Sequence, residues 1–178
     1  ADGREQIIPR DRSDVWRFQV KDGVDRVLFG NPGYRLGYAK DALTSYFVLK
    51  TLREKGVLPK GMRLQVSMPM LDSVVRPLTF PRPGDLAKIR PGYEEAIAAE
   101  LAAMLDFIPP EDLAIQWDLA WEVTAVHEDA ADNPEARIET HMPPITRLSK
   151  SLPETVALGF HFCFGTFGGW PRFSPPDL

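Results

Sequence analysis

The spacing of hydrophobic residues alternates along the chain between a strand-like and a helix-like period. Apolar residues at every second position are typical of strands, and apolar residues three and four positions apart are typical of helices. The strand-like runs cover residues 15–20, 26–29, 63–69, 113–117 and 156–164, and the helix-like runs cover 39–55, 93–108 and a short segment at 144–151. The stretches that fit neither period, and are predicted as loops, are 1–14, 74–91 and 127–136.

The order strand, helix, strand, helix, strand favours βαβ units and a parallel sheet. The 17 prolines cluster at the junctions between these segments, as expected where strands and helices meet through fixed loops. The pattern accounts for about half of an eight-stranded barrel, and a closed (β/α)8 TIM barrel usually needs about 250 residues. The 178 residues therefore predict one α/β domain over 1–178, either part of a TIM-barrel-like fold or a smaller open sheet.

Composition excludes several classes of protein and leaves the chemistry open. The net charge is -4 and no basic stripe is present, which argues against a nucleic-acid partner. No apolar run reaches the roughly 18 residues of a membrane span, and the charged opening segment 1–12 is unlike a signal peptide. The single cysteine fits a reducing compartment. These features predict a soluble, cytoplasmic protein without a membrane partner.

Polar residues two positions apart stand at the ends of three predicted strands. The pairs are Gln65 and Ser67, Gln116 and Asp118, and His161 and Cys163. Residues at i and i+2 of a strand point to the same face, and the positions between these pairs are apolar. Each strand therefore has one polar and one apolar face near its carboxyl end. Three such pairs on successive strands predict a binding site for a small molecule.

His161 and Cys163 are candidate zinc ligands. Imidazole nitrogen and thiolate sulfur both bind zinc well, and a same-face pair can share one ion. Zinc held in this way lowers the pKa of an incoming thiol and makes it a nucleophile. The competing interpretation is a buried cysteine beside a hydrogen-bonded histidine.

Asp118 is the candidate catalytic residue. It follows an apolar strand, and it could bind a substrate amine or act as a general acid or base. The alternative is an N-cap for the next helix. Glu122, four residues later, could share the site or lie at the surface, and the glutamines with Ser67 could bind a ligand or one another. His127 and His141 stand in polar stretches and are expected at the surface.

Three segments resemble the superfamily of cobalamin-independent methionine synthase and uroporphyrinogen decarboxylase, as an uncharacterised branch of it. They are GFHFCFG (159–165), DLAIQWDLAWE (112–122) and LQVSMPMLDSVV (64–75). The resemblance implies a TIM barrel in which His161 and Cys163 bind zinc and Asp118 binds the substrate.

The chain departs from the synthase at several points. It has no second cysteine, and Leu119 stands where the synthase has a carboxylate. By the resemblance, the first barrel strand and the C-terminal part, which carries the synthase's remaining zinc ligands, are missing. Synthesis of methionine from folate is therefore not expected.

Three functions follow as hypotheses. The first is a zinc-dependent methyl- or alkyl-transfer enzyme that activates a thiol. The second is a metal-free lyase or decarboxylase, with Asp118 as acid or base and Arg4, Arg10 and Arg12 binding substrate carboxylates. The third is a binding or assembly protein that pairs with a second copy or a complementing chain, because a partial barrel exposes strand edges.

Overall fold

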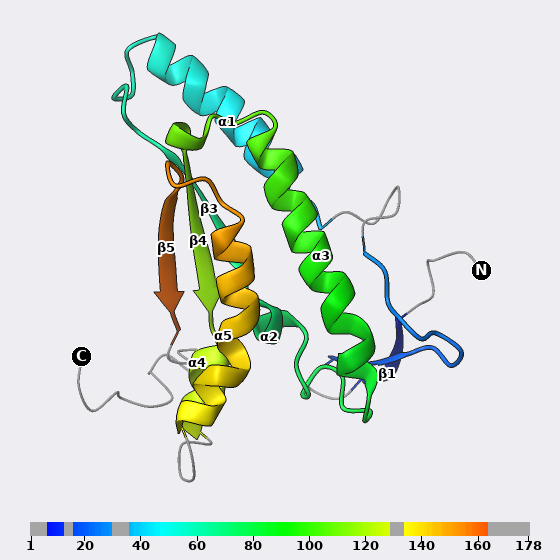
Figure 1. The fold of residues 1–178 in the computed structure, drawn as a ribbon. Coiled ribbons are helices and arrows are strands. Elements are labelled where there is room, and N and C mark those ends of the chain that lie inside the picture. The colour runs from blue at the N-terminus through cyan, green and yellow to red at the C-terminus, as the bar shows by residue number, and fades with distance from the viewer. Residues whose placement is uncertain (1–6, 13–15, 30–35, 129–133, 164–178) are drawn as a thin grey trace.

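The computed structural model describes residues 7–12, 16–29, 36–128 and 134–163 (Figure 1). The strands are β1 (Ile7–Arg12), β2 (Trp16–Val20), β3 (Leu64–Pro69), β4 (Leu113–Leu119) and β5 (Ala157–Phe162). The helices are α1 (Tyr38–Glu54), α2 (Leu71–Val74), α3 (Asp85–Leu105), α4 (Trp121–Glu128) and α5 (Pro134–Lys150), with a 3-10 turn, η2, at Pro110–Asp112.

The described strands form two small sheets. Strands β3, β4 and β5 are parallel, with β4 in the centre, and β1 pairs antiparallel with β2 in a separate hairpin. The expected parallel sheet of βαβ units is therefore present. The prediction of a partial (β/α)8 TIM barrel is wrong, because three parallel strands form an open sheet and a barrel must close on itself.

Several predicted elements differ from the structure. Residues 26–29 form no strand, and the predicted loop over 1–14 contains β1. Helix α3 begins at Asp85, inside the predicted loop over 74–91. The buried Asp85 carboxylate accepts a hydrogen bond from the Val20 amide at 2.8 Å, which ties this first turn to β2. Helix α5 also extends through Pro143 and Pro144, which the sequence pattern treats as breaks.

Strand β4 has one buried side and one open side. Its side chains at Leu113, Ile115, Trp117 and Leu119 are between 0% and 6% exposed, and the residues between them are half-buried. In register, the apolar residues of β3 and β5 lie on the same side of the sheet as those of β4, although Leu158, Phe160 and Phe162 of β5 are exposed there. We call the side of the sheet that carries Trp117 the covered face and the opposite side the open face.

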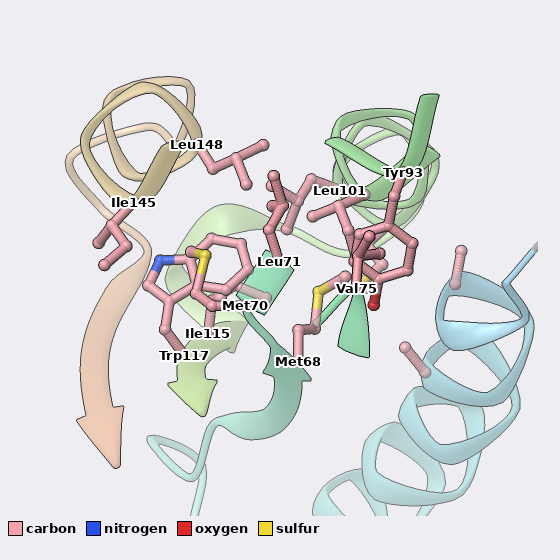
Figure 2. Close-up of a cluster of buried hydrophobic side chains, with 14 of the residues drawn as sticks. Met68, Met70, Leu71, Val75, Tyr93, Leu101, Ile115, Trp117, Ile145 and Leu148 are labelled. Atoms are coloured by element: carbon pink, nitrogen blue, oxygen red, sulfur yellow. The ribbon is translucent and has the colours of Figure 1, made fainter. Parts of the chain in front are cut away.

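Helices α3 and α5 pack on the covered face (Figure 2). Leu101 of α3 and Leu148 of α5 are buried with Trp117 in one hydrophobic cluster. The Trp117 indole Nε1 donates a hydrogen bond to Ser149 Oγ at 3.0 Å. The largest side chain of the core therefore has its one polar atom satisfied, and this bond also fixes α5 over β4.

The start of helix α1 is capped from another helix. The buried Glu100 carboxylate on α3 accepts hydrogen bonds from the Ala39 amide at 2.6 Å and the Gly37 amide at 3.2 Å. A negative charge is favourable at a helix N-terminus, where amide groups lack intrahelical partners. Glu100 therefore joins α1 to α3.

The end of helix α1 is held by Asp112, just before β4. Arg53 donates two hydrogen bonds to this carboxylate, at 2.5 and 2.6 Å, and Tyr46 donates a third at 2.6 Å. The Arg53 hydrogen bonds lower the pKa of Asp112 to about 2. This ionised carboxylate fixes α1 beside the amino end of the sheet.

Gly92 allows helix α3 to contact the backbone of the segment that follows β2. A Cβ at Gly92 would lie 2.0 Å from the carbonyl oxygen of Val27, and Val27 itself is buried. The Val27 amide also donates a hydrogen bond to the Lys88 carbonyl at 2.9 Å. Loop and helix are thus too close for any side chain at position 92.

We expect Gly92→Ala to destabilise the fold by about 2 kcal/mol, measured by urea unfolding. Alanine adds about 1 kcal/mol of helix propensity, but overpacking against a backbone atom typically costs about 1–3 kcal/mol or more. Gly61→Ala, which would meet no atom within 4 Å, is the control. A Gly92→Ala variant as stable as the wild type would contradict this packing.

Candidate functional site

The open face brings together most of the residues predicted as a site. Gln116 pairs in register with Ser67 on β3, and Asp118 pairs with His161 on β5. Neighbouring strands lie about 4.8 Å apart, so Asp118 and His161 are adjacent at the carboxyl end of the sheet. Gln65 lies one step further back on β3. All five side chains are exposed or half-buried.

A hydrogen-bond network fixes the centre of the open face. The Gln116 amide nitrogen donates to Ser67 Oγ at 3.2 Å and to Asp118 Oδ1 at 3.0 Å. The Gln116 oxygen accepts a hydrogen bond from the Gln65 amide at 3.1 Å. Because hydrogen bonds to Gln65 and Ser67 hold the Gln116 side chain in place, its hydrogen bond to Asp118 orients that carboxylate. Within the described residues, Oδ2 of Asp118 has no hydrogen-bond partner and is available to a ligand.

Asp118 does not cap helix α4. The amides of Ala120 and Trp121 instead donate hydrogen bonds to Ser73 Oγ, at 3.0 and 3.2 Å. The alternative role of Asp118 as an N-cap is therefore filled by a residue of α2. This leaves the carboxylate on the open face with no structural role at the helix start.

His161 and Cys163 stand at the end of β5. The Cys163 amide donates a hydrogen bond to the Leu119 carbonyl at 3.2 Å, which continues the parallel pairing one residue beyond the strand. His161 is exposed and Cys163 is half-buried. Neither side chain has a hydrogen bond or ion pair in the described part of the chain. As far as the described residues go, both side chains are available to a ligand.

The described residues do not complete a metal site. Within 7–12, 16–29, 36–128 and 134–163, no three His, Cys, Asp or Glu side chains are placed to hold one ion. His161 and Cys163 are the right types of ligand for zinc, but a catalytic zinc uses three protein ligands. The pair alone therefore does not fit a complete catalytic zinc centre.

Glu122 lies away from the open face. Its carboxylate is buried and accepts hydrogen bonds from the Asp72 and Ser73 amides at 2.8 and 3.1 Å, and from Ser73 Oγ at 2.6 Å. Burial raises the pKa of Glu122, and the Ser73 hydrogen bonds partly oppose this shift. Glu122 caps α2 while Ser73 caps α4, so the two helices hold each other at the carboxyl ends of β3 and β4.

A second polar cluster, which the sequence pattern did not predict, lies beside this pair of helices around the buried Asp72. Asp72 is 3% exposed and accepts hydrogen bonds from Arg90 of α3 and from Nδ1 of His141 of α5, the latter at 2.5 Å. Arg90 Nε is buried without a partner in the described residues. The expected surface position of His141 is thus wrong, whereas His127 is exposed as expected.

The position of Asp72 could have signalled this cluster. It follows β3 by three residues, and acidic residues at or after the carboxyl ends of parallel strands often lie near a site. His141 gave no such signal, because two prolines closely follow it in the sequence, Pro143 and Pro144, and the pattern treats them as breaks. Its burial depends on α5 packing across the sheet.

Comparisons of the chain with known protein families, with curated proteins and with solved structures found no match. The resemblance to the methionine synthase and uroporphyrinogen decarboxylase superfamily therefore stays a prediction from sequence segments. Among the described helices, none is both long and apolar enough to cross a membrane.

The partly buried His141 is expected to make stability depend on pH. Burial lowers the pKa of His141 below its ordinary value of 6.5, and the charges of Arg90 and Arg137 lower it further, against an opposing effect of Glu122. The unfolded chain therefore binds more protons than the folded chain just below pH 6.5. We expect the contribution of His141 to the free energy of unfolding to fall as the pH drops from about 8 to about 5, whereas the raised pKa of Glu122 acts in the opposite direction.

The comparison that isolates this effect is the pH slope of unfolding in His141→Gln. The variant should lose part of the slope, whatever its absolute stability. His127→Gln, which changes an exposed histidine on α4, is the matched control. An unchanged slope in His141→Gln would show that this histidine is not buried in the folded protein.

Proposed function

We propose that the protein is an enzyme that binds a small polar substrate on the open face, with Asp118 as the charged group that holds it. The observation that carries the proposal is the register of β4 and β5, which sets Asp118 beside His161 on an uncovered surface. The carboxylate is held by Gln116 through one oxygen and has its other oxygen free of described partners. A substrate amine or hydroxyl can bind there.

The reaction we favour is methyl or alkyl transfer to a thiol. Its support is the pairing of His161 and Cys163 on one side of the end of β5, next to Asp118, together with the sequence resemblance. Bound zinc would activate the thiol for attack. In this version Asp118 orients the substrate through its amine, and the remaining zinc ligands come from outside the described residues.

A metal-free lyase or decarboxylase is the second candidate. Its support is the open-face carboxylate of Asp118, which needs no metal ion to act as a general acid or base. Asp118 would then move the proton, since it is the acidic side chain that β4 presents on the open face. Arg4 and the side chains of Arg10 and Arg12, proposed for substrate carboxylates, lie outside the described residues.

Metal content separates the two candidates. For the thiol-transfer enzyme we expect about one zinc per chain in protein purified without added metal, and loss of that zinc in Cys163→Ser. The measurement is elemental analysis, with circular dichroism to confirm that the variant is folded. Wild-type protein without zinc would exclude the favoured reaction and leave the metal-free one.

The substrate-binding role of Asp118 is tested with a thiol-bearing amino acid, L-homocysteine, as the probe. We expect Asp118→Asn to weaken its binding on the order of tenfold or more, because a hydrogen bond to a charged group contributes about 1.5–3 kcal/mol. The measurement is isothermal titration calorimetry. Asp106→Asn, an exposed acid at the end of α3, is the control.

Two outcomes would count against this role. Equal binding of L-homocysteine by the wild type and by Asp118→Asn would show that Asp118 does not bind the substrate. Equal weakening by Asp106→Asn would show only an effect of net charge.

A further inference from the structure

Among the elements that the structure describes, none covers the outer edge of the parallel sheet at β5 (Figure 1). Within the described residues β5 pairs with β4 alone, so its other edge carries unpaired backbone amides and carbonyls. The opposite edge of the sheet differs, because helix α1 packs against β3. The side chains of β5 are exposed or half-buried along its whole length.

The sequence of β5 carries none of the usual protection of a free edge. Proteins prevent such edges from pairing with another chain by means of charged residues, prolines or bulges. Strand β5, Ala157–Phe162 (ALGFHF), contains no Lys, Arg, Asp, Glu or Pro. Leu158, Phe160 and Phe162 share the covered face but are 43%, 44% and 53% exposed. A strand with a bare edge and three exposed apolar side chains is typical of strand pairing between chains.

We propose that β5 pairs antiparallel with β5 of a second copy of this chain, about a two-fold axis at Phe160. Residues opposite each other then sum to 320, so Leu158 faces Phe162 of the second copy and the two Phe160 rings face each other. On the open side, Gly159 faces His161. Apolar residues meet only apolar residues, and each exposed histidine has a glycine across from it.

The pattern of β5 selects this register over its neighbours. A shift by one residue would set apolar against polar positions, because the side-chain period is two. An axis at His161 would place two histidines directly opposite each other. An axis at Gly159 would leave Phe162 without a residue of the second copy's β5 opposite it. The pairing joins the two parallel sheets into one sheet of six strands, and the space opposite His161 stays open.

Substitution at the axis tests the interface. Phe160→Lys sets two like charges directly opposite each other, which destabilises a strand pair. We expect wild-type protein to be dimeric in sedimentation equilibrium, and the dimer dissociation constant to rise on the order of tenfold or more in Phe160→Lys. Phe47→Lys is the matched control, because Phe47 on α1 is 73% exposed and far from β5 in the sequence.

Cross-linking tests the register. In the proposed pairing Cys163 faces Ala157 of the second copy, so Ala157→Cys should give a disulfide-linked dimer on oxidation. Within one chain these positions are six residues apart along an extended strand, roughly 20 Å, which no disulfide can span. Leu158→Cys, which projects from the opposite face, should not cross-link.

Specific results would overturn the proposal. A wild type that stays monomeric, with β5 amides protected from hydrogen exchange, would mean that another segment covers the edge. A dimer that survives Phe160→Lys, or that Phe47→Lys weakens equally, would place the interface elsewhere. A dimer weakened only by Phe160→Lys but not cross-linked by Ala157→Cys would reject the proposed register.

Discussion

The alternation of side chains along β4 is the constraint on which the rest of the structure depends. Four apolar residues of this central strand are fully or almost fully buried under α3 and α5, and the positions between them face the other way. A slip of one residue would bury Asp118 and expose Trp117, so the hydrophobic effect that builds the core also fixes the position of the polar side chains. The candidate site is thus a consequence of core packing.

The carboxyl end of the sheet is held by reciprocal capping. The Glu122 carboxylate accepts hydrogen bonds from the backbone amides at the start of α2. Ser73 Oγ of α2 accepts hydrogen bonds from the backbone amides at the start of α4. Because these polar groups satisfy one another, Asp118 is not required at a helix start and remains on the open face. The buried Asp72 with Arg90 and His141 strengthens the same junction from the side of α3 and α5.

Short-range pattern predicted the parallel strands and the polar face. The two-residue period placed Gln116 and Asp118 on one side of β4, and the βαβ order placed β3 and β5 beside it. The pattern failed where tertiary packing decides. Helix α5 passes through Pro143 and Pro144 because Leu148 and Ser149 are held over Trp117, and His141 is partly buried for the same reason. Barrel closure was inferred from part of a sheet, which local periodicity cannot establish.

The central claim is that Asp118 and His161 are neighbours on the open face. The most direct measurement is disulfide formation in an Asp118→Cys, His161→Cys double variant that also carries Cys163→Ser. Register partners lie about 5 Å apart, within the range of a disulfide, so we expect an intrachain bond under mild oxidation. The Gln116→Cys, His161→Cys pair, diagonal and roughly 8 Å apart, should form little. Equal bonding in both variants, or none in the first, would contradict the register and with it the site.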